Sequence, residues 1–391
     1  MTSTKLPINM YDPTRDYNNH KEEYNNAIQN VLDKGNFING TQVKELESDL
    51  AKYVDVQDCI CVGNGTDALQ IALMAFDIGP GDEVITTPFT WISTSEVISL
   101  LGAKPVYVDI RKDTFAIDES KIEEAITSKT KAIMPVSLYG ILPDYSKIND
   151  IANKHNIPVI EDAAQSFGSV QNGKKSCGLT TIGCTSFFPT KPLGCYGDGG
   201  AIFTNNKELG NKMRAIKGHG ALKRFNHTYI GVNSRLDTIH ASILQIKLKN
   251  FDNCLINRQK IAERYNEAFH KLDYVKIPIP VYNDIRMTEV SSLHTKQTEC
   301  AWAQYSLILE NNIDRDGLVT KLKEKSINVA IFYPNVLHQQ ECFKYLEYDH
   351  DAFDVASEVS NHIINLPCYG ELSYDEQTYI IDTFCELVTS I

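Results

Sequence analysis

A single lysine, Lys191, stands among residues that disfavour its charge. Its neighbours along the chain are apolar: Phe187, Phe188, Pro189, Pro192 and Leu193. Apolar surroundings push a lysine towards the neutral amine, which is a nucleophile for aldehydes and ketones. Glycines at 194, 197, 199 and 200 permit tight turns beside it. An ordinary solvated lysine in a glycine-rich turn is the alternative, and this stretch alone does not decide between the two.

Two other stretches supply groups with which such a lysine could work. Asp162 closes an apolar strand, and α/β proteins bind ligands at the carboxyl ends of their strands. Residues 63–70 form a glycine turn that opens a helix, whose free N–H groups and dipole suit a phosphate. An amine for an aldehyde, a carboxylate for a pyridine nitrogen and a helix start for a phosphate are the three requirements of pyridoxal 5′-phosphate (PLP). The sequence therefore predicts a PLP site.

Composition limits the class of protein. A chain of 391 residues that is 42% apolar can bury a core large enough for two packed regions. The net charge of −12 argues against nucleic acid or an anionic membrane as a general partner, and no apolar run reaches the roughly 20 residues of a membrane helix. Ten cysteines without a C-x-x-C pair indicate free thiols in a reducing compartment. We expect a cytoplasmic protein with no metal, membrane or nucleic-acid partner.

Short apolar strands alternate with helical segments through most of the chain. We predict strands over 59–62, 84–87, 105–109, 132–138, 158–161, 182–188 and 201–204, and helices over 17–34, 41–53, 67–76, 91–101, 119–125 and 146–155. This alternation is typical of an α/β fold with a mostly parallel sheet covered on both faces. Lys191 would lie between the last two strands.

The last third of the chain reads as a smaller α/β layer. A long helix is expected over 239–269, and Pro278, Pro280 and a polar stretch over 283–300 mark a change of domain. A strand over 305–309, a helix over 315–325, a strand over 329–332 and a terminal helix follow. We expect a large PLP-binding domain over 1–250, which includes the N-terminal segment, and a smaller domain over 251–391.

Five stretches in this order closely resemble the PLP-dependent sugar aminotransferases of the DegT/DnrJ/EryC1/StrS family, which have the type I aminotransferase fold. The stretches are 35–41, 63–68, 161–165, 186–200 and 231–235. The resemblance implies that Lys191 binds the cofactor covalently and carries protons, and that Asp162 pairs with the pyridinium nitrogen. It also implies that Gln165 lies near the phenolic oxygen and that Trp91 stacks on the ring.

The resemblance further places Gly65, Thr66, Asp67 and Ser186 around the phosphate, with Asn233 reaching it from the neighbouring subunit of a homodimer. Taken singly, three of these residues have ordinary interpretations: Ser186 as a strand hydroxyl, Asn233 as a helix cap and Trp91 as a core residue. The family implies L-glutamate as the amino donor and a nucleotide-linked keto sugar as the acceptor. Some members carry histidine in place of the lysine and are dehydratases, so the lysine here favours transamination.

Basic residues after the site could meet the nucleotide diphosphate. We choose Lys223 and Arg224 over the earlier Lys212, Arg214 and Lys217, although a solvated basic face explains most of the cluster equally well. The other residues expected to bind substrate are His219, Arg235, Phe332, Tyr333 and His338.

Two clues to the sugar disagree. Phe-Tyr-Pro at 332–334 resembles members that act on 4-keto-6-deoxy sugars, whereas the stretch around Lys191 resembles members that aminate C3 of UDP-linked 3-keto uronic sugars. Because an uncharged aromatic suits a methyl group better than a carboxylate, the main prediction is a 4-amino-4,6-dideoxy sugar, with C3 amination as the alternative. The nucleotide, the stereochemistry and assembly beyond the dimer are left open.

Two rivals belong to other classes. A PLP- or sugar-binding regulator without turnover usually carries a DNA-binding segment, and no basic recognition helix is visible. A nucleotide-dependent dehydrogenase would need a third glycine after Gly63-Asn-Gly65, which is missing at the required spacing. Asp162 also lies far beyond the ~20 residues by which a ribose-binding acid should follow the turn.

Overall fold

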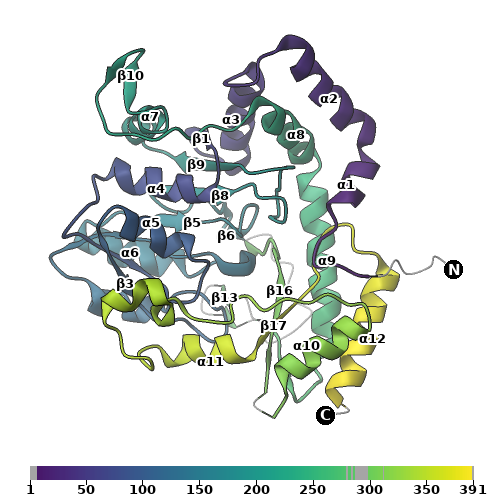
Figure 1. Cartoon of the computed structure of the whole chain (residues 1–391). Coiled ribbons are helices and arrows are strands. Elements are labelled where there is room, and N and C mark those ends of the chain that lie inside the picture. The colour runs from purple at the N-terminus through teal and green to yellow at the C-terminus, as the bar shows by residue number, and fades with distance from the viewer. Residues whose placement is uncertain (1–6, 279–280, 283–284, 287–297, 311, 390–391) are drawn as a thin grey trace.

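Two sets of strands, flanked by helices, form the sheet of the larger part of the molecule (Figure 1). The computed structural model describes residues 7–278, 281–282, 285–286, 298–310 and 312–389. The strands are Asp58–Val62 (β1), Glu83–Thr86 (β2), Lys104–Tyr107 (β3), Thr130–Ile133 (β4), Ile160–Asp162 (β5), Ile182–Ser186 (β8) and Gly200–Thr204 (β9). They pair in the orders β1-β9-β8-β5 and β3-β2-β4.

Parallel bridges from Ile133 to Val159 and from Val136 to Asp162 connect the two sets of strands. All pairs in the two sets are parallel except those of β9, which runs antiparallel to both of its neighbours. The predicted α/β fold is confirmed, with a mixed rather than a uniformly parallel sheet.

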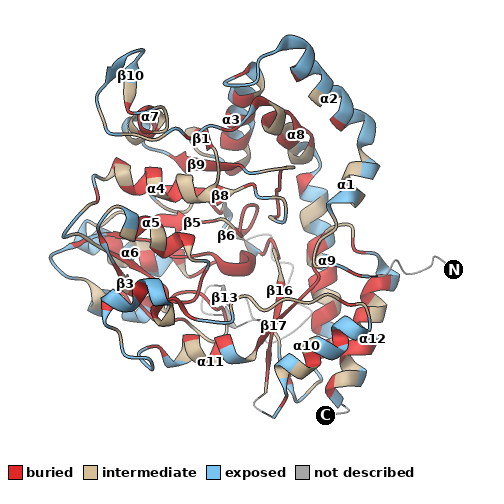
Figure 2. Cartoon of the chain, in the orientation of Figure 1, coloured by how far each residue is buried: buried red, intermediate tan, exposed pale blue. Residues whose placement is uncertain are grey.

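Side chains of β1 alternate between two buried clusters on opposite faces of this sheet. Cys59 and Cys61 pack with residues of α3 (Thr41–Val54) and α8 (Thr238–Lys249). Ile60 and Val62 pack with α4 (Gly65–Ala75) and α5 (Ser93–Leu100). Because successive strand residues point to opposite faces, both faces need a helical cover. Figure 2 shows the resulting pattern, with buried strands between helices whose outer surfaces are exposed.

The remaining connections of the large sheet differ in places from the predicted elements. Helices α6 (Tyr145–His155) and α7 (Lys207–Ile216) form, but the helix expected over 119–125 is two short 3-10 turns, Glu119–Lys121 and Glu123–Ala125. Strand β4 ends at Ile133, short of the predicted 138. Pro135 follows soon after and has no N–H to continue a ladder. Short strands that were not predicted are Val170–Gln171 (β6), Lys174–Lys175 (β7), Ala221–Lys223 (β10) and Asn226–His227 (β11).

Two helices that we expected to be continuous are each broken once. The helix predicted over 17–34 is in fact two helices, α1 (Pro13–Asn19) and α2 (Lys21–Lys34), separated by His20, whose backbone is not helical. α1 begins earlier than predicted because the Asp12 side chain caps it by accepting from the N–H of Thr14. The second is α8 and α9 (Phe251–Phe269), which meet at Asn250 with φ −103° and ψ 5°. The long α9 runs towards the C-terminal part of the chain (Figure 1).

The C-terminal part has an antiparallel sheet of its own, β12-β16-β17, with bounds Val275–Lys276, Tyr305–Leu309 and Ile363–Leu366. Its helices are Arg315–Glu324 (α10), Asp354–His362 (α11) and Tyr374–Thr389 (α12). The strand predicted over 329–332 is wrong. Only Ala330 pairs with the backbone of Asn365, and the Asn365 side chain then accepts from the N–H of Phe332 at 2.8 Å. β17 was not predicted.

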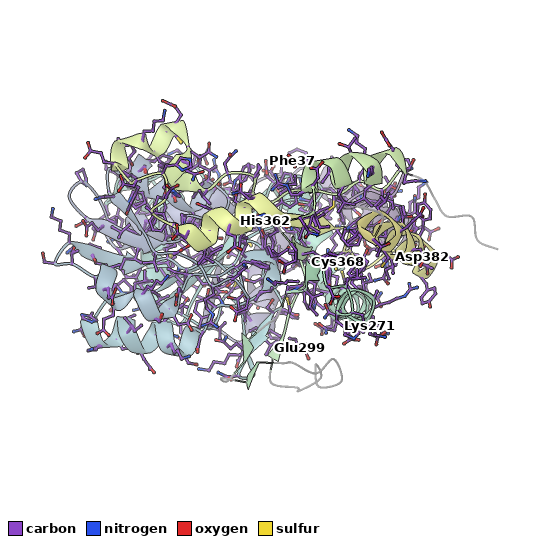
Figure 3. All side chains as sticks on the ribbon, turned by 90° about the horizontal axis from the view of Figure 1, so that it is seen from below. Phe37, Lys271, Glu299, His362, Cys368 and Asp382 are labelled. Atoms are coloured by element: carbon purple, nitrogen blue, oxygen red, sulfur yellow. The ribbon has the colours of Figure 1, made fainter. Side chains whose placement is uncertain are left out.

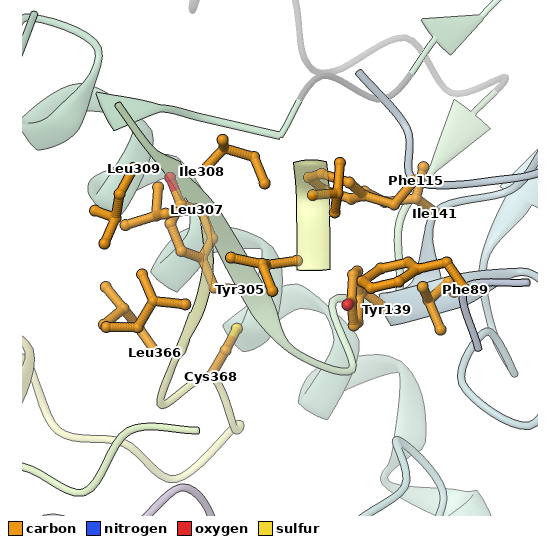
Figure 4. Close-up of a cluster of buried hydrophobic side chains, with 14 of the residues drawn as sticks. Phe89, Phe115, Tyr139, Ile141, Tyr305, Leu307, Ile308, Leu309, Leu366 and Cys368 are labelled. Atoms are coloured by element: carbon orange, nitrogen blue, oxygen red, sulfur yellow. The ribbon is translucent and has the colours of Figure 1, made fainter. Parts of the chain in front are cut away.

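Part of the stretch that marked a domain change, at 280, 283–284 and 287–297, lies outside the described residues. The boundary at residue 250 stays a prediction. Phe89 and Tyr139, from the side of the large sheet, share one buried cluster with Tyr305 and Leu366 of the smaller sheet (Figure 4). This shared core fixes the smaller sheet against residues that lie beside the site.

Candidate active site

Lys191 lies in the loop between β8 and β9, and this loop is folded tightly on itself. The N–H of Lys191 donates to the carbonyl of Phe188 at 2.9 Å, and that of Cys195 donates to Phe187 at 2.7 Å. A Cβ at Gly194 would stand 2.4 Å from the carbonyl oxygen of Pro189, so no larger residue fits. Burial lowers the pKa of the Lys191 amine to about 8, although the Asp162 carboxylate opposes the shift. The amine is therefore partly neutral near physiological pH.

Asp162 is buried at the carboxyl end of β5. Its two oxygens accept separate hydrogen bonds, from the Thr94 hydroxyl at 2.7 Å and from the N–H of Ala164 at 3.2 Å. Burial raises the pKa of Asp162, which these hydrogen bonds and Lys191 only partly offset. A buried carboxylate with a raised pKa favours a proton or a cationic group beside it, as a protonated ring nitrogen would be.

The start of α4 gathers the residues expected to bind a phosphate. The helix begins at Gly65, two residues earlier than predicted, and Asn64 caps it by accepting from the N–H of Asp67 at 2.8 Å. The Thr66 hydroxyl lies 2.8 Å from that of Ser93. A Cβ at Gly65 would come 2.8 Å from the Cβ of Ser186, which shows that β8 closes against the helix start. The hydroxyl residues Thr66 and Ser186 thus lie together with the N-terminus of α4, as a phosphate site requires.

Gln165 connects the large sheet with the C-terminal part. Its side-chain oxygen accepts from the N–H of Tyr139 at 2.8 Å, and its nitrogen donates to the Tyr333 hydroxyl at 3.1 Å. The Tyr333 ring lies 6.1 Å from that of Trp91. Trp91 is 58% exposed, so its interpretation as a core residue is wrong for this chain, and its ring is free to face a ligand.

Two further residues expected to bind the sugar, Phe332 and His338, make contacts with other protein groups. The Phe332 carbonyl accepts from the Tyr139 hydroxyl. His338 is buried, with its Nε2 2.9 Å from the carbonyl of His350 and its ring 4.9 Å from that of Phe353, and burial lowers its pKa. Its contacts are therefore with the C-terminal part, and the structure does not bring it together with Lys191.

The basic cluster divides into paired and exposed members. Lys212 pairs with Asp77 at 2.7 Å, Arg214 pairs with Glu47 and Asp58, and Lys217 donates to the carbonyl of Cys61. By contrast, Lys223 and Arg224 are exposed on the β10–β11 hairpin. Both exposed side chains can meet a ligand, although the Arg224 guanidinium lies over the Phe225 ring at 4.9 Å, whereas the three earlier residues hold polar partners within the chain.

Asn233, Arg235 and His219 are exposed and stay predictions. The residue between the first two, Ser234, is buried, and its hydroxyl accepts from the N–H of Gly63 at 2.8 Å. Sequence reasoning missed Ser234, Thr94 and Tyr139. Thr94 follows Trp91 by almost one helical turn, which was the available signal, but the contacts of Ser234 and Tyr139 join residues far apart in the chain.

The residues present fit PLP. The amine of Lys191 and the carboxylate of Asp162 are close enough to influence each other's pKa. The helix start with Thr66 and Ser186 offers a third, phosphate-binding point. Among the described residues, no helix is long and apolar enough to cross a membrane.

Residues 18–385 match the DegT/DnrJ/EryC1/StrS aminotransferase family. A UDP-2-acetamido-2-deoxy-3-oxo-D-glucuronate aminotransferase from Pseudomonas aeruginosa is 44% identical over 95% of this chain and 96% of its own. A pleiotropic regulatory protein from Geobacillus stearothermophilus is 39% identical over 97% and 98%. A dTDP-3-amino-3,6-dideoxy-alpha-D-galactopyranose transaminase from Aneurinibacillus thermoaerophilus is 37% identical over 93% and 94%.

Solved structures agree with these likenesses. A DegT DnrJ EryC1 StrS aminotransferase from Brucella abortus superposes with a TM-score of 0.89 at 37% identity, covering 97% of this chain and 99% of its own. The Bacillus subtilis protein NtdA, solved with bound cofactor PMP, superposes with a TM-score of 0.88 at 29% identity, covering 99% and 86%. PMP is the amino form of PLP, which is the cofactor predicted from the sequence.

Proposed function

This chain belongs to the DegT/DnrJ/EryC1/StrS aminotransferase family, and we propose that it aminates C3 of a UDP-linked 3-keto sugar with L-glutamate as the donor. As a member, it is a PLP-dependent sugar aminotransferase. The observation that carries the proposal is the 44% identity, over nearly the whole of both chains, to an enzyme named for a UDP-linked 3-oxo sugar.

The relatives favour C3 over the C4 position that we predicted. The dTDP-sugar transaminase, too, is named for a 3-amino sugar. Of the two sequence clues that disagreed, the stretch around Lys191 agrees with the relatives, and Phe332 is not a sign of a 4-keto substrate in this chain. In the structure, both the N–H and the carbonyl of Phe332 bind protein groups, so this segment also has a structural role.

Each site residue would have a separate role in such a reaction. Bound PLP supplies an electron sink for the carbon that loses a proton. Asp162, held by Thr94 and Ala164, would keep a positive charge on the ring nitrogen. Lys191, whose pKa of about 8 lies near neutrality, can give and take a proton at its amine. The α4 start with Thr66 and Ser186 would hold the phosphate, and Trp91 would cover the ring.

We also propose a cytoplasmic homodimer with its active site at the subunit interface. The β10–β11 hairpin and the residues after it expose Leu222 (56%), Phe225 (82%) and Ile230 (89%), and such a patch supports contact with a second copy. Mixing the Lys191→Ala and Asn233→Ala variants tests this arrangement. If Asn233 serves the neighbouring subunit, mixed dimers regain one intact site, whereas unchanged inactivity would contradict the shared site.

The test of the activity uses purified protein, L-glutamate and matched UDP-linked 3-keto and 4-keto sugars. We expect 2-oxoglutarate release and an aminated product, detected by mass, from the 3-keto sugar at least about tenfold faster, because a misplaced carbonyl loses orientation. Preference for the 4-keto sugar would overturn the C3 assignment. Absence of bound PLP would overturn the whole proposal.

A second candidate, a regulator, is favoured by the names of two relatives, the Geobacillus stearothermophilus protein and a sensory transduction protein from Saccharopolyspora erythraea. The presence of Lys191 beside Asp162 supports turnover instead, since binding alone needs no amine of lowered pKa. The release of 2-oxoglutarate in the same assay separates the two.

A further inference from the structure

A cleft opens beside Lys191 on the side of the N-terminal helix. Its volume is about 650 Å³, and Lys191 and Gly194 line it. The other lining residues come mainly from α1, from the junction of α8 and α9, and from residues 370–371. This volume exceeds that of an amino acid, so a donor that must reach the Lys191 amine fits within it.

Arg258 on α9 lines this cleft and is only 2% exposed. Its Nη1 donates to the backbone carbonyls of Trp302 at 2.9 Å and Cys368 at 2.7 Å, and its buried Nε has no hydrogen-bond partner among the residues that the structure describes. Cys368 is labelled in Figure 3, where it lies among closely packed side chains. Carbonyl groups satisfy hydrogen bonds but do not cancel the guanidinium charge.

Two other basic side chains that line the cleft, Arg15 and Lys247, already have carboxylate partners. Arg15 forms two hydrogen bonds with Glu376, at 2.7 and 2.6 Å, and Lys247 lies 3.2 Å from Asp16. Among the described residues Arg258 forms no ion pair with a carboxylate; its nearby groups are the thiols of Cys254 and Cys368, and Glu371, which also lines the cleft, acts on it more weakly. A buried cation without a counter-ion is costly, so this position favours an incoming anion.

We propose that Arg258 binds a carboxylate of the amino donor in this cleft. This inference rests on the proposed function and assigns it a donor-binding residue. An amino acid carries its α-carboxylate one carbon from its amine, so a donor at Lys191 must place a negative charge close by. Arginine is the side chain that binds a carboxylate through parallel N–H bonds, and a lysine at the same position cannot reproduce them.

The test compares Arg258→Lys with wild type in the two half-reactions, each followed by the absorbance of the bound cofactor. We expect the half-reaction with L-glutamate to lose about tenfold or more in kcat/KM, and the half-reaction with the keto sugar to change less than about threefold. Arg264→Lys is the matched control, because Arg264 lies on the same helix outside the cleft and donates to Tyr374, Gln377 and Thr378.

Two donor analogues separate carboxylate binding from a structural role. L-glutamine lacks the side-chain carboxylate and L-isoglutamine lacks the α-carboxylate, so the variant should spare the analogue that lacks the bound group. Glutarate, which has no amine, should bind wild type at least about tenfold more tightly than Arg258→Lys by calorimetry.

Equal losses with every donor and with the keto sugar would show that Arg258 only supports the fold and would overturn the inference. An unchanged glutamate half-reaction would overturn it too. If wild type itself shows no transamination, it is the proposed function that fails.

Discussion

Lys191 stands in the β8–β9 loop, Asp162 at the end of β5 and Thr66 at the start of α4, whereas Lys223 and Arg224 stand on the β10–β11 hairpin. The first group is held by the chain itself, as the Thr94–Asp162 bond at 2.7 Å shows. The second group is exposed. We infer that the first region sets the chemistry and the second selects the acceptor. Substitutions in the first should alter rate with every substrate, and those in the second should alter mainly the sugar.

Lys191→Ala should have the largest effect. Removing the amine removes both the covalent attachment and the proton carrier, so we expect activity to fall by at least about 10²- to 10⁴-fold with all substrates. Measurements of kcat in both half-reactions check this, with circular dichroism as the control for folding. Comparable turnover by the variant would show that another residue carries the proton.

Asp162→Asn comes next. The amide can still accept from Thr94 but carries no charge, so the ring nitrogen loses its anionic partner. We expect kcat to fall by about 10²-fold in both half-reactions, a size typical for the loss of one buried electrostatic contact at a reacting centre. A loss confined to the sugar half-reaction would contradict this role, because Asp162 would then act on the acceptor and not on the chemistry common to both half-reactions.

Phe332→His should change sugar preference more than cofactor affinity. The carbonyl of Phe332 accepts from Tyr139 through the backbone, so a histidine can keep this contact while it presents a polar ring. We expect the ratio of kcat/KM between 3-keto and 4-keto sugars to shift by about tenfold, the size of one good hydrogen bond to a substrate. PLP affinity, measured by fluorescence titration, should stay within about twofold. Equal losses of both would contradict its proposed place.

Lys223→Ala combined with Arg224→Ala should act on the nucleotide sugar alone. Both side chains are exposed, so each contributes a modest, salt-dependent attraction to a diphosphate. We expect KM for the nucleotide sugar to rise about fivefold at low salt and less at high salt, with the glutamate half-reaction unchanged. Lys212→Ala, which removes a lysine already paired with Asp77, is the control and should leave KM unchanged.

The smallest effect concerns stability and pH. Burial lowers the pKa of Lys191 from 10.5 to about 8, so between these values the unfolded chain binds a proton that the folded chain lacks. The free energy of unfolding of the cofactor-free protein should therefore rise with pH across this window. Urea titrations at pH 7.5 and 10 should show this rise in wild type and a smaller one in Lys191→Met. Identical pH profiles would mean that the folded lysine keeps an ordinary pKa.

The order of the motifs determined the family, the α/β fold and the cofactor. Each motif acts through backbone geometry close to it in the chain: apolar runs form strands, Asn64 caps α4, and position 194 needs glycine because a Cβ there would stand 2.4 Å from the Pro189 carbonyl oxygen. Such local rules can be read from a sequence. The same rules failed where a helix break or a single side-chain bond intervened, as at His20, Asn250 and Asn365.

Only the tertiary structure decided which side chains meet. Gln165 reaches Tyr333 across 168 positions and Ser234 reaches Gly63 across 171. Arg258 is buried, and in the described part of the chain it forms no ion pair with a carboxylate. Likewise, the paired and the exposed lysines and arginines of residues 212–224 look alike in sequence. These outcomes depend on how helices and sheets pack against each other, and packing sums many weak contacts between distant segments, so neither spacing nor composition specifies them.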